Sequence, residues 1–175
     1  IVMDDSMALK CYCANGIVNP NLNAHTFPYR TDGGELFLGT EFTQISREFD
    51  EFQDSPRDNP EKVKRIFIWF PGSDRKGATL DAVRAMKSIP GQFVADVFVS
   101  MDFAKGEELA QEIGLDDRFV FMNDSPMKAR RMTAADFAIT SPDTSFHELM
   151  MLRVPCAIIS NPEVPEQQAL GEYAG

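Results

Sequence analysis

Four short polar segments in the second half of the chain carry the residue types that could bind an anionic or hydroxyl-rich ligand. Each follows an apolar run of strand length, and they are residues 71–74 (PGSD), 123–125 (NDS), 141–145 (SPDTS) and 161–167 (NPEVPEQ). Ser, Thr, Asp and Asn offer hydroxyl, amide and carboxylate groups, and a glycine lets the backbone approach a ligand closely. A helix that begins at such a segment carries about half a positive charge at its start, which favours phosphate. The expected chemistry is binding of a phosphorylated or hydroxyl-rich ligand.

An alternation of strand-like and helix-like runs from Arg65 onward must position these segments. Strands are expected at residues 65–70, 93–100, 119–122, 135–140 and 155–160, and helices at 79–89, 106–114, 127–135, 146–153 and 164–175. Each strand is apolar at nearly every position and is followed by one helix, which is typical of a parallel sheet covered on both faces. The pattern predicts an α/β fold, a Rossmann-like doubly wound parallel sheet of about five strands. The carboxyl ends of such strands share one edge, so the polar segments should line it together.

The same polar residues also have a purely structural explanation. Ser, Thr, Asp and Asn are the preferred residues at helix starts, and replacing such a cap by alanine costs about 1 kcal/mol without any ligand being involved. Ser145 and Glu148 match a capping box, in which the glutamate reaches back to a backbone N–H group. From the pattern alone, a helix cap and a ligand site therefore remain open as alternatives for residues 141–145.

The first third of the chain differs in texture from the rest. Residues 1–50 are rich in Asn, Asp, Gly and Thr and predict an N-terminal arm or partial domain, whereas residues 51–64 combine prolines with dense mixed charge and predict a linker. Residues 65–175 form the expected Rossmann-like domain. The chain opens with IVMDD rather than methionine, which we interpret as the end of a buried strand and an acidic turn. The arm is then expected to be left from a preceding domain, which would pack on residues 1–50.

Composition excludes several classes of partner. The chain of 175 residues has 27 acidic and 17 basic side chains and a net charge of -10, which disfavours nucleic acid. No apolar stretch approaches the roughly 20 residues of a membrane-spanning helix, and no signal peptide opens the chain. Cys11, Cys13 and Cys156 form no disulfide framework, which favours a cytoplasmic setting. With only His25 and His147 as further ligands, no metal site is expected.

Several motifs follow one another in the order and spacing of a known protein family. They are IVMDD (1–5), NPNL (19–22), LGTEFTQISREF (38–49), RIFIWFPGSD (65–74) and ADFAITSPDTSFHEL (135–149). Together they resemble the UDP-sugar hydrolase of pseudaminic acid biosynthesis and the spore-coat polysaccharide proteins of the SpsG type, which are GT-B glycosyltransferase-like. The resemblance implies that residues 65–175 are the C-terminal half of a GT-B fold.

The resemblance also implies a ligand and roles for individual residues. A UDP-linked nucleotide sugar would bind with its ribose at Glu148, its diphosphate at Thr144 and Ser145, and a further contact from Ser73. The complete set of candidate binding residues is Gly72, Ser73, Asp143, Thr144, Ser145, Glu148 and Gln167. The implied function is the nucleotide-sugar-binding domain of a glycosyltransferase or UDP-sugar hydrolase in surface polysaccharide or sialic-acid-like sugar biosynthesis, with no further cofactor.

This sequence departs from the family pattern at the positions that matter most for phosphate. Pro71–Gly72 and Pro142–Asp143 stand where the family has paired glycines, and Asp143 places a carboxylate where a diphosphate would lie. The family's glycine-rich N-terminal loop with its histidine is absent from these residues, so no catalytic residue is assigned and this segment alone is expected to be inactive. The alternative is a degenerate, non-catalytic Rossmann-like domain that acts as an interaction module.

Overall fold

The computed structural model describes residues 1–57, 60–74, 76–123 and 127–160. Contacts divide these residues into two compact units, a smaller one of residues 1–45 with residue 160 and a larger one of residues 46–159. Each unit is described by itself. Within the described residues, no helix is long and apolar enough to cross a membrane.

The larger unit is built on a five-stranded sheet in which every pair of neighbours is parallel. Its strands are β4 (Arg65–Trp69), β5 (Val94–Val99), β6 (Phe119–Asn123), β7 (Phe137–Thr140) and β8 (Cys156–Ile158). Their order is β6-β5-β4-β7-β8, so the first strand lies in the middle and the chain builds outward on both sides of it. The predicted α/β class and the Rossmann-like parallel sheet of about five strands are confirmed.

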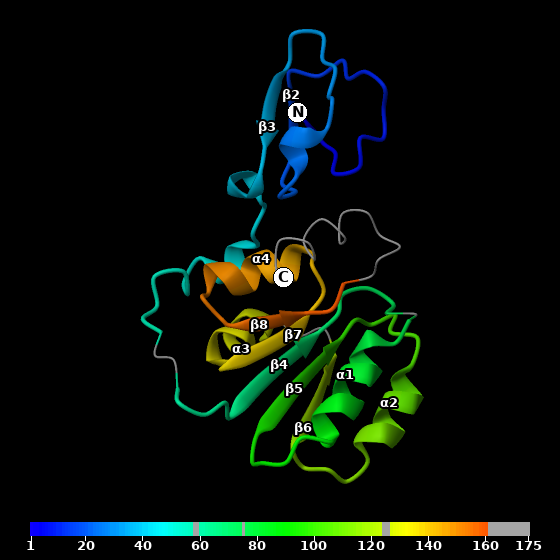
Figure 1. Ribbon diagram of the computed structural model, residues 1–175, viewed down its shortest axis with the longest axis vertical. Coiled ribbons are helices and arrows are strands. Elements are labelled where there is room, and N and C mark those ends of the chain that lie inside the picture. The colour runs from blue at the N-terminus through cyan, green and yellow to red at the C-terminus, as the bar shows by residue number, and fades with distance from the viewer. Residues whose placement is uncertain (58–59, 75, 124–126, 161–175) are drawn as a thin grey trace. The chain divides into compact units, whose positions relative to one another are not determined.

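Four helices cover this sheet. They are α1 (Ala78–Lys87), α2 (Gly106–Ile113), α3 (Lys128–Ala134) and α4 (Thr144–Met151). Figure 1 shows α1 and α2 on one face of the sheet and α3 and α4 on the other. This division follows from the strand order, because the chain turns one way from β4 to β6 and the other way from β7 to β8. The helix predicted at residues 164–175 lies outside the described residues.

Each face of the sheet has its own core. On the α1 and α2 face, alternate residues of the strands form one apolar cluster with Leu80, Val83 and Leu109 from the helices. On the other face, the rings of Phe67 and Phe98 lie 5.0 Å apart at their centroids. A short 3-10 turn, η3 (Arg47–Phe49), adds the fully buried ring of Phe49 to the larger unit. The three inner strands, β5, β4 and β7, are therefore covered on both sides.

The two edge strands of the sheet, β6 and β8, are exceptions to this double coverage. Strand β8 pairs only with β7, and Ala157 is exposed on it. Strand β6 pairs only with β5, and the side chains of Val120 and Phe121 are exposed on it. The expectation that every apolar strand is covered on both faces is therefore wrong for β6. Its apolar run has the composition of a buried strand, but its position at the sheet edge leaves it less covered.

The smaller unit holds a three-stranded parallel sheet in the order β1-β2-β3. Its strands are β1 (Val2–Met3), β2 (Gly16–Asn19) and β3 (Glu35–Leu38), with 3-10 turns η1 (Ala24–Thr26) and η2 (Thr40–Phe42). Strand β2 is central and largely buried, whereas both residues of β1 are exposed. The interpretation of IVMDD as the end of a strand is confirmed, but its burial is not, because β1 has a neighbour on one side only.

Candidate functional site

The strand order places a topological switch point between β4 and β7. Strands β4 and β7 are neighbours, and Trp69 pairs with Thr140 at their carboxyl ends. The chain leaves β4 toward α1 on one face and leaves β7 toward α4 on the other (Figure 1). Ligands bind in parallel sheets at such a topological switch point, because the two connections diverge there. The predicted residues 72–73 and 143–145 follow these two strands and therefore lie at the same edge.

Two hydrogen bonds hold the segment after β4 to the segment after β5. Gly72 has a φ of 76°, which a glycine adopts without strain, and its N–H group donates to Ser100 Oγ at 3.1 Å. The carbonyl of Ser73 accepts from the N–H group of Ala104 at 3.1 Å. A Cβ atom built on Gly72 meets no atom within 4 Å, so this turn borders open space. The segment is thus fixed in position and accessible.

The start of α1 is already occupied by a carboxylate of the chain itself. Asp74 Oδ1 accepts from the N–H groups of Gly77 at 3.1 Å and Ala78 at 2.9 Å, and its Oδ2 accepts from Thr79 at 2.8 Å. These are the amide groups that a bound anion would use. Asp74 therefore closes the start of α1 to phosphate.

The start of α4 is closed in the same way, by Asp143. This residue is the N-cap, and its Oδ1 accepts from the N–H group of Ser145 at 2.7 Å while Ser141 Oγ donates to its other oxygen. The predicted capping box is wrong: Ser145 lies inside the helix and Glu148 contacts Lys128 instead. Asp143 is the cap because its backbone is extended, which lets its side-chain carboxylate accept from the N–H group of the residue two positions later.

The carboxyl group of Asp143 is partly buried. Burial raises its pKa, while the hydrogen bonds from Ser141 and Ser145 act in the opposite direction. Of the two residues predicted to bind the diphosphate, Thr144 is exposed but Ser145 is buried and its N–H group is bonded to Asp143. Only Thr144 is therefore free to contact a ligand without rearrangement.

Glu148, the predicted ribose-binding residue, lies in a buried ion pair. It is 3% exposed, and its Oε2 lies 3.2 Å from Lys128 Nζ. Lys128 begins α3 and also lies 4.0 Å from Glu48 Oε1. Its ammonium group stands over the rings of Phe49 and Trp69, 5.5 and 5.9 Å from their centroids. Without any ligand, the carboxylate of Glu148 is thus paired with a cation that itself lies near two aromatic rings.

Opposing effects act on the pKa of Glu148. Burial is the largest and raises it, Lys128 lowers it, and the carboxylates of Glu48 and Asp143 raise it. The balance lies above the ordinary value of 4.5. Lys128 therefore stabilises the charged form of the buried Glu148 carboxylate, and the two residues form a coupled ion pair.

His147 is a neighbour of this cluster and has the character of a packing residue. It is half-buried, burial lowers its pKa, and its ring lies 5.5 Å from that of Phe146. An adjacent position on a helix turns a side chain by about 100°, which directs His147 away from Glu148. A lowered pKa favours the neutral imidazole, which fits a packing role.

A buried aspartate on the same face of the sheet, with two arginine partners, is not among the predicted residues. Asp96 lies fully buried on β5, with its Oδ1 3.4 Å from Arg131 Nη1 and its Oδ2 3.6 Å from Arg65 Nη1. A carboxylate inside an apolar strand must be paired, so Asp96 itself was the available signal. Arg131, which lies on α3, pairs with this aspartate rather than with solvent alone.

The remaining candidates add little to the site. Gln167 and the whole of the predicted segment 161–167 lie outside the described residues. Among the residues that are described, no group of three or more His, Cys, Asp or Glu side chains could hold a metal ion. Neither a scan against protein-family models nor a search of curated proteins finds a match to this chain.

Proposed function

We propose that the larger unit is the nucleotide-sugar-binding domain of a cytoplasmic GT-B-like glycosyltransferase or UDP-sugar hydrolase, acting in surface polysaccharide or sialic-acid-like sugar biosynthesis. The observation that supports this most is the meeting of two predicted segments, after β4 and after β7, at the switch point of a parallel sheet. Gly72 and Thr144 offer an accessible surface there, and Glu148 lies one helical turn further in.

Binding of the diphosphate requires two local changes in this proposal. The carboxylate of Asp143 must release the N–H group of Ser145, and Glu148 must exchange part of its contact with Lys128 for the ribose hydroxyls. Lys128 would then face the ligand's negative charge. The domain contributes binding and orientation, and amide groups at a helix start stabilise charge on a departing diphosphate.

Calorimetric titration of the full chain with UDP and UDP-N-acetylglucosamine tests this function. We expect Glu148→Ala to weaken binding at least about tenfold, since a carboxylate that accepts ribose hydroxyls makes charge-assisted bonds worth about 1.5–3 kcal/mol. The matched control is Glu107→Ala, which removes an exposed carboxylate from the first turn of α2. Absence of heat with both nucleotides refutes the proposal, and equal effects of the two variants refute the role of Glu148.

Asp143→Gly provides an independent arm of the same titration. It removes a like charge from the start of α4 and restores the glycine of the family pattern. Like charges about 4 Å apart in a partly screened site repel by several kcal/mol, so the variant should bind UDP at least about tenfold more tightly than the natural chain. Unchanged affinity would mean that no phosphate approaches this helix start.

A second candidate function, a non-catalytic interaction module, is favoured by one specific observation. The polar groups at the switch point are satisfied without a ligand, since Asp74 and Asp143 occupy the starts of α1 and α4 and Lys128 neutralises Glu148. Thermal denaturation separates the two functions. A nucleotide at 100 times its dissociation constant stabilises a protein by about 2.7 kcal/mol, so unmoved melting curves with uridine and other nucleotides favour the module.

A further inference from the structure

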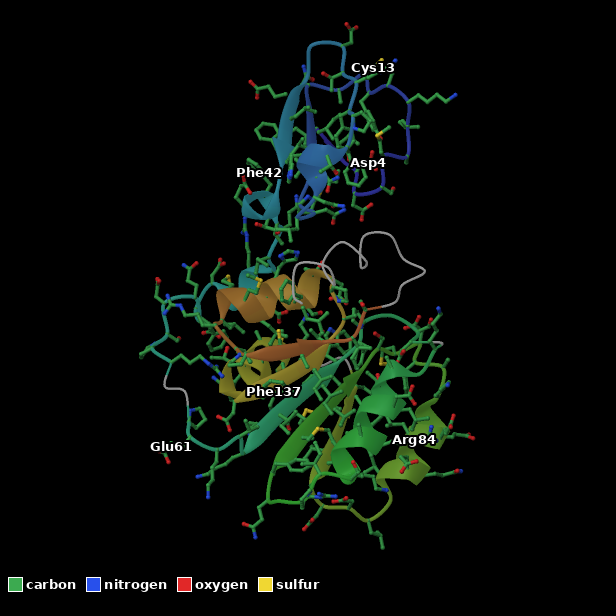
Figure 2. The ribbon with its side chains drawn as sticks, viewed as in Figure 1. Asp4, Cys13, Phe42, Glu61, Arg84 and Phe137 are labelled. Carbon is green, nitrogen blue, oxygen red and sulfur yellow. The ribbon has the colours of Figure 1, made fainter. Side chains whose placement is uncertain are left out.

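Two cysteines of the smaller unit form a pair that the proposed function does not use. Cys11 and Cys13 are both free and exposed, whereas Tyr12 between them is only 2% exposed. This alternation is typical of an extended backbone, in which successive side chains point to opposite sides. Figure 2 labels Cys13 on this unit. The two thiols therefore lie on the same outward side of the chain.

Tyr12 fixes the backbone between the two thiols. Its N–H group donates to the carbonyl of Arg30 at 3.0 Å, and its own carbonyl accepts from Asp32 at 3.5 Å. Its phenolic hydroxyl donates to the carboxylate of Asp4 and accepts from the N–H group of Leu9 at 3.0 Å. The cysteines are thus held on either side of an anchored residue, so little conformational entropy is lost when both engage one ligand.

The spacing decides which ligand the pair can accept. In an extended segment the chain rises about 3.3 Å per residue, so the Cα atoms of residues two positions apart are about 6.6 Å apart. A disulfide needs Cβ atoms about 3.8 Å apart, so direct oxidation of this pair would break the contacts of Tyr12. A bridging metal ion adds two metal–sulfur bonds of about 2.3 Å each, which spans the gap without moving the backbone.

We propose that Cys11 and Cys13 bind one soft monovalent metal ion, Cu(I), through their two thiolates. Soft thiolate ligands select Cu(I), and this ion forms linear complexes with two sulfurs. Structural zinc takes four ligands, and the described residues offer no group of three or more. Binding releases the thiol protons, one from each cysteine that is protonated beforehand. This site is independent of the proposed nucleotide-sugar function.

Anaerobic titration of the reduced full chain with Cu(I), in competition with bathocuproine disulfonate, tests the proposal. We expect one Cu(I) per chain, and a loss of affinity of at least about 100-fold in Cys11→Ser and in Cys13→Ser, because each leaves a single thiolate. The matched control is Cys156→Ser. Cys156 is half-buried, and burial raises the pKa of its thiol, so this variant should bind Cu(I) like the natural chain.

Three results would overturn the site. One is a natural chain that competes for Cu(I) no better than the Cys11→Ser/Cys13→Ser double variant. Another is a single variant that retains the natural affinity. The third is one Cu(I) per two chains together with a dimer in analytical ultracentrifugation, because the thiols would then be supplied by separate copies. Circular dichroism of each serine variant establishes that it is folded, as expected for exposed cysteines.

Discussion

Replacing Lys128 with methionine should expose how strongly the buried Glu148 depends on its cation. Methionine keeps most of the aliphatic stem that packs near Phe49 and Trp69, so the main change is loss of the ammonium group. Removing one partner of a buried pair costs about 3–5 kcal/mol, because the other charge is left uncompensated. Lys128 keeps a side-chain exposure of 17%, which places the expected loss near the lower limit, about 3 kcal/mol at pH 8.

The loss should depend on pH in a defined direction. The pKa of Glu148 is raised in the folded protein, so the folded state binds this proton more tightly than the unfolded chain. Such a group contributes stability that is fully present below the ordinary pKa of 4.5 and is lost as the pH rises through the folded pKa. Without Lys128 the folded pKa rises further. Lys128→Met should therefore be nearly as stable as the natural chain at pH 4 and progressively less stable toward pH 8.

Urea denaturation of both proteins between pH 4 and pH 8 measures this effect. Lys87→Met is the matched control, since Lys87 Nζ lies 3.1 Å from Glu112 Oε1 but its side chain is 34% exposed, and exposed pairs contribute little. Adding Glu148→Gln to Lys128→Met should restore stability at pH 8, because no charge is then left buried. A pH-independent loss in Lys128→Met, or an equal loss in Lys87→Met, would refute the reasoning.

Two further predictions concern the fold that positions the site. Asp74→Ala removes three hydrogen bonds to the start of α1 and should lower the free energy of unfolding, measured by urea denaturation, by about 1–2 kcal/mol. Asp74→Asn should retain part of the stability that these bonds provide. An unchanged denaturation midpoint in Asp74→Ala would contradict the capping role. Leu149→Ala should lower it by about 3 kcal/mol because Leu149 is fully buried, while Met150→Ala, at a residue 58% exposed, should change it little; comparable losses would contradict the assigned helix face.

The sheet was predictable from sequence because its signal is repeated. Five apolar runs, each followed by an amphipathic run, leave few folds other than a parallel sheet with helices on both faces. The prediction was wrong where the position of a strand in the sheet decides exposure. Val120 and Phe121 on β6 and Val2 on β1 have the composition of buried strand residues, but both strands lie at an edge. Strand order depends on tertiary contacts, which composition does not contain.

The candidate site was predictable in its location but not in its internal contacts. Parallel strands bring their carboxyl ends together, so the polar segments after β4 and β7 had to meet. Asp143 and Ser145 are two positions apart, and the side chain of either could cap a helix, so the sequence did not decide where α4 begins. Lys128 was missed because it begins α3 beside Arg130 and Arg131, and sequence does not tell which cation turns toward a buried carboxylate.

The central place of β4 has a consequence for the nascent chain. Strand β4 is the first strand of the five-stranded sheet to be made, but its second neighbour, β7, follows much later. Thr140 Oγ1 on β7 donates to the carbonyl of Trp69 on β4 at 2.8 Å, across 71 positions of the chain. Loop closure over this distance costs more entropy than the local pairing of β4 with β5, so high contact order slows the final step. During translation the edge of β4 that pairs with β7 therefore stays unpaired until β7 has left the ribosome. A chaperone that recognises unpaired apolar strands should bind in that interval.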